Sequence, residues 1–171
     1  LNDTVCDGYT QALCDGNGHG THVAGTIRSS IAGYSLSTTI HAIKVLSAAG
    51  SGYTSGIFEG MDWAASTHTT KYSGTPGMLS MSLGGGYSPI YDQVVDAVKA
   101  KGLVVIVAAG NSNDDACYSS PAAAEGAFTI GASNIEDSRA SFSNYGICVD
   151  LSYQTKTVPR SCGYIRKING D

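Results

Sequence analysis

Residues 15–26, which read Asp-Gly-Asn-Gly-His-Gly-Thr-His-Val-Ala-Gly-Thr, decide how this chain is interpreted. Their alternating glycines predict a tight turn, because glycine permits backbone angles and close approaches that other residues resist. The turn delivers His19 to the start of a helix that we predict over residues 19–32. Imidazole is the side chain best suited to move protons near neutral pH, so His19 is a candidate general base. Small and apolar residues favour close packing of this helix in a core: Val23, Ala24, Gly25 and Ile27.

Phosphate-binding loops and zinc sites also use glycine-rich turns or histidines, but the residue spacing in this segment argues against both. A phosphate-binding loop needs Gly-x-Gly-x-x-Gly or a Gly-Lys-Ser/Thr ending, and this segment has neither. A helical zinc site needs His-Glu-x-x-His, and no glutamate lies between His19 and His22. A lone histidine is also common as an ordinary surface residue, so that interpretation stays open on the residue alone.

Taken as a whole, residues 15–26 resemble the histidine motif of the subtilisin-like serine proteases (subtilases, peptidase S8 family), most of all the proteinase K branch. The resemblance implies that His19 is the general base and that His22 is a structural histidine. It also implies an α/β fold, the subtilisin-like three-layer domain with a mostly parallel sheet, which we expect to be incomplete at both ends.

Composition limits the class of protein. A chain of 171 residues favours one domain with a sizeable core, and 42% hydrophobic with 14% charged residues is typical of a globular protein. The net charge of −4 argues against nucleic acid as a partner. No apolar run approaches the roughly 18 residues of a membrane span, and the first residues lack the features of a signal peptide. We expect a monomer without a membrane partner.

The chain contains five cysteines, and none of them forms a Cys-x-x-Cys pair, which argues against zinc. Five cysteines in a chain of low charge favour an oxidising compartment, so we expect a secreted, extracellular protein. An odd number leaves at least one thiol outside an internal pair. Cys6 with Cys14 is one possible local pair, and a fully reduced set is the alternative. The five are Cys6, Cys14, Cys117, Cys148 and Cys162.

Hydrophobic periodicity predicts that strands and helices alternate after the first helix. Residues 54–69 are predicted to bury one stripe of the helix, and residues 103–109 are a continuous apolar run, typical of a parallel strand buried on both faces. This alternation favours an α/β domain with a parallel sheet. We predict strands over 39–46, 78–83 and 103–109, and helices over 54–69 and 88–102.

Chemistry in parallel sheets gathers at the carboxyl ends of the strands, where two glycine-rich exits follow predicted strands. The amide of Asn111 is a possible donor to an anion, although asparagine also ends strands as an ordinary turn-former. Val-Ala-Ala-Gly-Asn resembles the family's oxyanion-hole segment, which makes Asn111 the implied oxyanion donor. The implied substrate-binding residues are Ala108, Ala109 and Gly110 on one pocket wall, Ser82, Leu83 and Gly84 on the opposite wall, and Gly50, Ser51 and Gly52 on a further edge.

Exposed backbone at two such edges can pair with an extended peptide, so polypeptides are the expected substrates. The resemblance continues through residues 120–122, 130–133 and 142–146, and therefore runs from about 15 to 150. It implies a disulfide between Cys117 and Cys148. It also implies a structural calcium ion held by the backbone carbonyls of Glu125 and Ala127 and the carboxylate of Asp150. The alternative for Asp150 is a solvated residue at the end of a strand.

The sequence departs from the family in two motifs. The Asp-Thr-Gly or Asp-Ser-Gly that follows an apolar strand does not precede His19, and Asp15 lies too near His19 to replace it. The nucleophile motif Gly-Thr-Ser-Met-Ala does not occur, and residues 151–171 lose the likeness. We therefore expect residues 1–150 to be a partial catalytic domain followed by a divergent tail, in a fragment or an altered gene product.

The sequence thus predicts a serine-type endopeptidase that hydrolyses peptide bonds without a cofactor for the chemistry, inactive as this chain alone. The central expectation is that the imidazole of His19 and the amide of Asn111 converge on one cleft. The alternative is a catalytically inactive relative that binds peptides. A nucleotide-binding α/β protein would need a phosphate loop and an acidic residue after the second strand, and the sequence has neither.

Overall fold

The computed structural model describes residues 14–31 and 33–154. Within them the chain forms two compact units, which divide between Gly60 and Met61. The expectations for Cys6, for Cys162 and for residues 155–171 of the predicted tail over 151–171 lie outside the described residues.

The first unit contains α1 (His19–Arg28), which confirms the predicted helix but ends four residues early. Gly18 is its N-cap, with a φ of 89° that lies in the left-handed region where glycine is favoured. At the other end the Ser29 N–H donates to the Gly25 carbonyl at 2.8 Å and closes the last turn. None of the residues of α1 is buried, so the expected tight packing of this helix in a core is wrong for the described structure.

The predicted strand over residues 39–46 is also wrong, because these residues have no strand conformation and no ladder partner among the described residues. A run that alternates apolar and polar residues forms a strand only when another strand accepts its backbone hydrogen bonds. The segment instead leads into a turn in which the Ser47 N–H donates to the Ser51 carbonyl at 2.9 Å.

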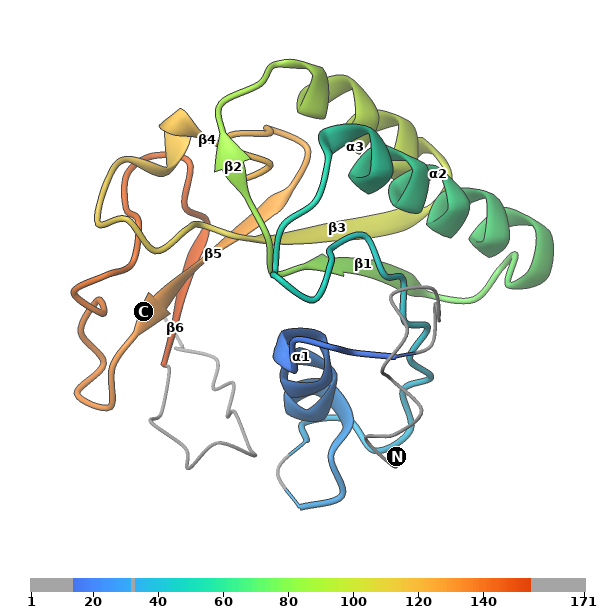
Figure 1. Ribbon diagram of the computed structural model, residues 1–171, viewed down its shortest axis with the longest axis horizontal. Coiled ribbons are helices and arrows are strands. Elements are labelled where there is room, and N and C mark those ends of the chain that lie inside the picture. The colour runs from blue at the N-terminus through green and yellow to red at the C-terminus, as the bar shows by residue number, and fades with distance from the viewer. Residues whose placement is uncertain (1–13, 32, 155–171) are drawn as a thin grey trace. The chain divides into compact units, whose positions relative to one another are not determined.

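The second unit is built on a four-stranded sheet in the order β1-β3-β5-β6, in which every pair is parallel (Figure 1). Two of the strands were predicted, while β5 and β6 were not. A separate antiparallel pair joins β2 (Gly85–Gly86) to β4 (Ser119–Ser120). The four strands of the sheet are β1 (Gly77–Met81), β3 (Leu103–Ala108), β5 (Phe128–Ser133) and β6 (Leu151–Gln154). The sheet therefore continues past residue 150.

Two helices lie next to each other along the sheet, α3 (Ile90–Ala100) and the part of α2 (Thr54–Lys71) that belongs to this unit, from Met61 on (Figure 1). Both were predicted, and Pro89 is the N-cap of α3. The spacing of their apolar residues explains the packing, because positions three and four apart share one face of a helix. The residues that they bury include Ile57, Met61 and Ala65 of α2 and Tyr91, Val95 and Val98 of α3.

The strands alternate between a buried face and a more exposed one. In β3 the side chain of Val105 is 1% exposed and that of its neighbour Val104 is 50% exposed. Met78 and Phe128 are likewise exposed, on the strands to either side. The expectation that residues 103–109 are buried on both faces is therefore wrong for this structure. An apolar run shows that both faces are apolar, and other elements decide whether both are covered.

The pairing of β1 with β3 fixes the position of the two strand exits. Met81 is the register partner of Val107, so both strands end at the same edge of the sheet. Residues 82–84 and 108–111 leave this edge as neighbours. Both predicted pocket walls therefore begin at this edge of the sheet.

The buried face of α2 provides a test of the packing. We expect Met61→Ala to lower the free energy of unfolding by about 2–5 kcal/mol, because Met61 is only 2% exposed and its removal leaves a cavity. Asp62→Ala, on the exposed side of the same helix, is the control and should change it by less than about 0.5 kcal/mol. Urea titration measures both values, and equal losses would contradict this packing.

Candidate active site

His19 is the first residue of α1, and its side chain is exposed. Among the described residues its imidazole has no hydrogen-bond partner. The turn before it is held in place by other groups, so the ring is presented without being fixed. An accessible imidazole at the start of a helix is able to exchange protons with a bound group.

Asp15 organises the turn that carries His19. Its Oδ1 accepts hydrogen bonds from the backbone N–H of Asn17 at 3.0 Å and of Gly18 at 2.8 Å. Its Oδ2 accepts from the backbone N–H of Thr21 at 2.7 Å and from the Thr21 hydroxyl at 2.8 Å. The Thr21 N–H belongs to the first turn of α1, and the Gly18 N–H to its N-cap, which provides no capping side chain of its own. Asp15 therefore caps the helix from three residues before the N-cap.

These hydrogen bonds also control the charge of Asp15. Partial burial alone would raise the pKa of this carboxyl, but the hydrogen bonds from Thr21, Gly18 and Asn17 hold it well below the usual value. Sequence reasoning considered Asp15 only as a triad member and missed this role. The available signal was an acidic residue just before a predicted helix start.

Asn17 connects the histidine turn to the edge at Gly50, Ser51 and Gly52. Its side-chain amide donates to the Ala48 carbonyl at 2.9 Å. A second connection runs from Lys44 Nζ to the Cys14 carbonyl, also at 2.9 Å. The three edge residues are exposed. The bond from Asn17 thus ties the turn before His19 to the loop that leads into the predicted substrate edge.

The other two predicted edges lie together in the second unit. Ser82 and Gly84 are exposed and Leu83 is half-buried. On the neighbouring exit, Ala109 is buried, and its N–H donates to the Ile130 carbonyl at 2.9 Å. The Ala109 bond extends the sheet one residue beyond β3 and fixes where the exit begins.

Asn111 follows this exit, and its side chain is exposed with no hydrogen-bond partner among the described residues. A turn-forming asparagine usually bonds to the backbone nearby. Here that task belongs to Asn144, whose Oδ1 accepts from the Ser112 N–H at 2.9 Å. Within the described structure the amide of Asn111 is available to donate to a further group.

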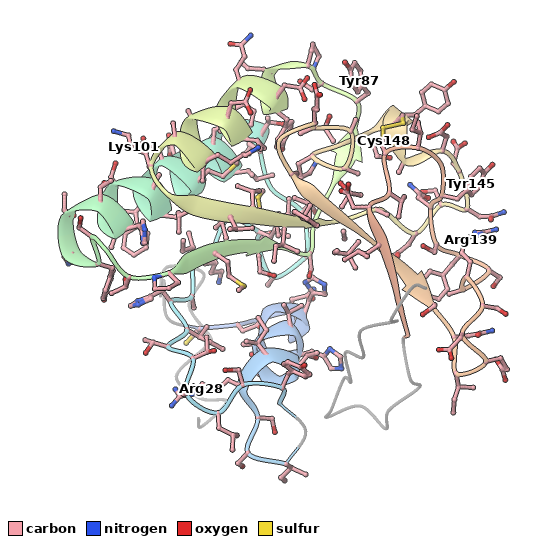
Figure 2. All side chains as sticks on the ribbon, turned by 180° about the vertical axis from the view of Figure 1, so that it is seen from behind. Arg28, Tyr87, Lys101, Arg139, Tyr145 and Cys148 are labelled. Carbon is pink, nitrogen blue, oxygen red and sulfur yellow. A yellow bond between two sulfur atoms is a disulfide. The ribbon has the colours of Figure 1, made fainter. Side chains whose placement is uncertain are left out.

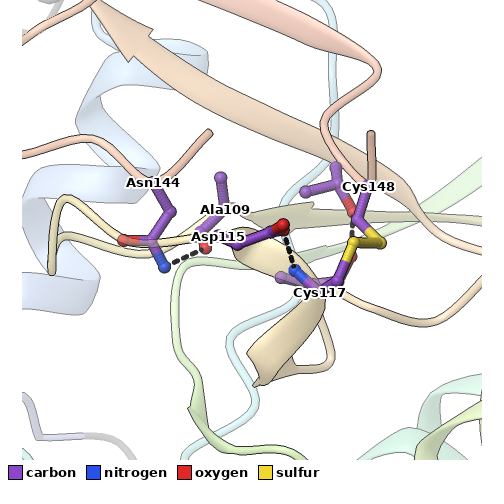
Figure 3. Close-up of a disulfide and its surroundings, with 7 residues drawn as sticks. Ala109, Asp115, Cys117, Asn144 and Cys148 are labelled. Atoms are coloured by element: carbon purple, nitrogen blue, oxygen red, sulfur yellow. Dashed lines mark hydrogen bonds between the residues drawn. A yellow bond between two sulfur atoms is a disulfide. The ribbon is translucent and has the colours of Figure 1, made fainter. Parts of the chain in front are cut away.

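A disulfide joins Cys117 to Cys148, with the two Cα atoms 5.4 Å apart (Figure 3). This is the pairing that the family resemblance implies. Beside it, the Asp115 carboxylate accepts from the Cys117 N–H at 2.9 Å. A small buried cluster lies next to the bridge and includes Ala109, Ala116 and Ala122, with Cys148 and Val149 packed against it. The bridge therefore supports the base of the exit that carries Asn111.

The residues expected to bind calcium line one surface pocket. Glu125, Ala127 and Asp150 surround it together with Thr129. The Asp150 carboxylate already accepts the Thr129 N–H at 2.8 Å through Oδ2, which leaves its second oxygen for a cation. No group of three or more acidic, histidine or cysteine side chains lies together among the described residues, so most ligands here would be carbonyls and water. The side chains of this pocket fit calcium only when carbonyls and water complete its coordination.

His19 lies in the first unit and Asn111 in the second. Each is exposed on a turn whose backbone is fixed by a neighbouring aspartate or asparagine. Their convergence on one cleft stays a prediction. Among the described residues, no helix combines the length and apolarity that a membrane span requires.

The chain belongs to the subtilase family, whose profile matches residues 3–165. It is 51% identical over 140 residues to a subtilisin-like serine protease of Rhodotorula mucilaginosa, across 80% of this chain and 41% of that relative. It is 49% identical over 150 residues to an extracellular serine proteinase of Thermus sp. (strain Rt41A), across 87% of this chain and 35% of that relative. The chain thus spans less than half the length of these relatives.

A solved structure agrees with the family and the fold. The crystal structure of a cold-adapted subtilisin-like serine proteinase superimposes with a TM-score of 0.79 at 43% identity, over 91% of this chain and 56% of that protein. This confirms the predicted subtilisin-like α/β fold.

The cap on α1 provides a pH-dependent test. We expect Asp15→Asn to lower stability by about 0.5–2 kcal/mol at pH 7 and to speed hydrogen exchange at the Gly18 and Thr21 amides. Because folding lowers the pKa of Asp15, its contribution is complete above the unfolded value of about 3.9 and is lost as the pH falls further. The difference from the parent chain should therefore hold from pH 8 to about 5 and shrink below about 4.

Asp62→Asn on the exposed side of α2 is the control for a change of net charge. Denaturant titration at several pH values gives the stabilities. A difference between parent and Asp15→Asn that grows on acidification would contradict the assigned cap.

Proposed function

We propose that this chain supplies the general base and the oxyanion donor of a serine endopeptidase. The observation that supports this best is the amide of Asn111, an exposed donor without a partner among the described residues, at the carboxyl end of β3. The backbone groups around it are bonded by Asn144 and β5, so it is a donor on a fixed support. The subtilisin-like relatives that are named serine proteases support the same chemistry.

In the proposed reaction a serine hydroxyl attacks the peptide carbonyl, and His19 accepts its proton and later gives it to the leaving amine. Asn111 Nδ2 donates to the oxygen on which negative charge develops. No cofactor takes part. The 171 residues contain neither Gly-Thr-Ser-Met-Ala nor Asp-Thr-Gly or Asp-Ser-Gly. We propose that the nucleophile and the carboxylate that orients His19 belong to further segments of the complete enzyme.

Extended polypeptides are the proposed substrates. Exposed glycine and serine residues at positions 50–52 and at Ser82 and Gly84 leave the backbone accessible to a peptide chain. Ala108, Ala109 and Gly110 would form the opposite wall. A disulfide and a relative named as extracellular support secretion, and we propose that the protein acts as a monomer.

A second candidate is a peptide-binding protein without catalysis. The exposed edges favour it, since they need no nucleophile to bind a peptide. In the endopeptidase, His19 and Asn111 promote hydrolysis once a serine nucleophile is supplied. In the peptide-binding protein they do not.

A chimera separates them. Segments of the Thermus relative that supply the aspartate and serine motifs are joined to this chain, and hydrolysis of a peptide anilide is measured. We expect activity that His19→Ala lowers by on the order of 10⁶ in kcat and Asn111→Ala by about 10²–10³. Ser112→Ala, a neighbouring exposed residue, is the control and should retain activity.

A folded chimera that binds peptide in calorimetry but does not hydrolyse it would contradict the endopeptidase and support the binding protein. The 171-residue chain alone should take up no fluorophosphonate label, because the motif that carries the reactive serine is missing.

We also propose a calcium site in the pocket of Glu125, Ala127 and Asp150, which would brace the loop before β5 against the start of β6. The second oxygen of Asp150 and the nearby carbonyls are the donors. Calcium prefers oxygen ligands and accepts carbonyls and water.

Metal removal tests this site. Calcium at 100 times its dissociation constant should stabilise the chain by about 2.7 kcal/mol, so EGTA should lower the melting temperature. Asp150→Asn keeps an acceptor for the Thr129 N–H and should lose most of the calcium response. Asp62→Asn is the matched control for charge. A response that survives in Asp150→Asn would exclude this pocket as the binding site.

A further inference from the structure

A buried asparagine, Asn144, lies beside the exit that carries Asn111. Its side chain is 2% exposed and is among the largest fully buried side chains of the described structure. Its Nδ2 donates to the Ala109 carbonyl at 2.9 Å (Figure 3), and its Oδ1 accepts from the Ser112 N–H at 2.9 Å and the Asp114 N–H at 3.2 Å. Its own N–H donates to the Gly110 carbonyl at 2.9 Å.

These four bonds fall on both sides of Asn111. Two hold the carbonyls of the residues before it, and two hold the N–H groups of residues after it. Asn111 itself contributes no bond to this network within the described residues. Its position therefore depends on a side chain from another loop.

The fit between Asn144 and the exit is close. Gly110 has a φ of 109°, and a Cβ atom at this position would overlap the Asn144 amide. Glycine is needed here for both the left-handed backbone and the approach of the amide. The amide has one orientation that satisfies all its partners, since Nδ2 must face a carbonyl and Oδ1 must face two N–H groups.

The loop that carries Asn144 is itself anchored to the same segment. The Asn113 N–H donates to the Phe142 carbonyl at 2.8 Å, and the Tyr145 N–H donates to the Asp114 carbonyl at 3.0 Å. Arg139 donates to the Asn113 side chain at 2.9 Å, and its guanidinium lies 5.0 Å from the centre of the Tyr145 ring. Figure 2 labels the side chains of Arg139 and Tyr145. The loop that carries Asn144 is therefore held by hydrogen bonds to the same segment that Asn144 itself holds.

We infer that Asn144 is a positioning residue that aims the amide of Asn111 at the oxyanion. This inference rests on the proposed function, because it assigns Asn144 a task only if Asn111 donates to a developing negative charge. A donor acts in the transition state only when it is held where the charge appears, and a misplacement of about 1 Å costs on the order of 10² in rate. Asn144 provides that constraint without touching the substrate.

The test uses the ¹⁵N-labelled 171-residue chain and a tetrapeptide with a free C-terminal carboxylate. The carboxylate stands in for the oxyanion, and the same peptide with a C-terminal amide is its uncharged counterpart. In the parent chain the Asn111 side-chain NH₂ signals should shift with the carboxylate peptide and much less with the amide peptide. Asn144→Asp, which keeps the acceptor but loses the donor, should reduce this difference at least fivefold.

Asn144→Ala is the uncharged second variant and should show the same loss, which separates positioning from charge repulsion. Asn134→Ala is the matched control: it removes an asparagine amide whose Oδ1 likewise accepts from two backbone N–H groups, those of Glu136 at 3.1 Å and Ser138 at 3.0 Å, and it should keep the response of Asn111. A response in both Asn144 variants equal to that of the parent would overturn the inference. No response in the parent chain would instead contradict the role of Asn111 in the proposed function, and with it the inference.

Hydrogen exchange in the parent chain decides the case in which neither variant folds. The Ser112 and Asp114 amides should exchange as slowly as the amides of β3, because Asn144 Oδ1 accepts from both. Rapid exchange at these two amides would overturn the inference even if Asn111 responds to the peptide.

The chimera gives a kinetic measurement. Asn144→Asp should lower kcat by about 10² with KM little changed. In the Asn111→Ala background the same substitution should have little further effect, because a positioning residue acts through the group that it positions. An additive loss would overturn the inference.

Discussion

The hydrogen bonds of one buried amide, that of Asn144, hold together the part of the sheet where the proposed chemistry lies. A buried amide must find partners for its donor and its acceptor, because each unsatisfied group costs about 1–3 kcal/mol. Asn144 finds them on the backbone of residues 109–114, far from it in sequence. The requirement therefore fixes the loop of Asn144 against the end of β3 and the residues that follow it.

The two proposed catalytic groups share a pattern. His19 and Asn111 are exposed and have no partner among the described residues, while Asp15 and Asn144 satisfy the backbone beside them. In each case one residue bonds the local backbone, and a different residue is proposed to take part in the reaction. The backbone of each turn is therefore ordered on folding, which would lower the cost of placing these groups against a substrate in the proposed reaction.

Sequence reasoning succeeded where the signal was local. The helix periods of 54–69 and 88–102, the strands at 78–83 and 103–109 and the motif of His19 all depend on residues close in the chain. It failed for residues 39–46 and for the second face of β3, because pairing and covering depend on partners elsewhere. It also missed β5 and β6, whose short mixed segments have no clear period.

The sequence by itself determined the family, the alternation of helices and strands, and the residue types available for proton transfer and oxyanion binding. Those follow from motifs and periods that are written within a few residues of each other. Only the tertiary structure decided that Asp15 caps α1, that β1 and β3 end at one edge, and that Asn144 holds the exit around Asn111. The reason is physical: a buried polar group takes whichever partners the fold brings within about 3 Å, and the sequence does not record those distances.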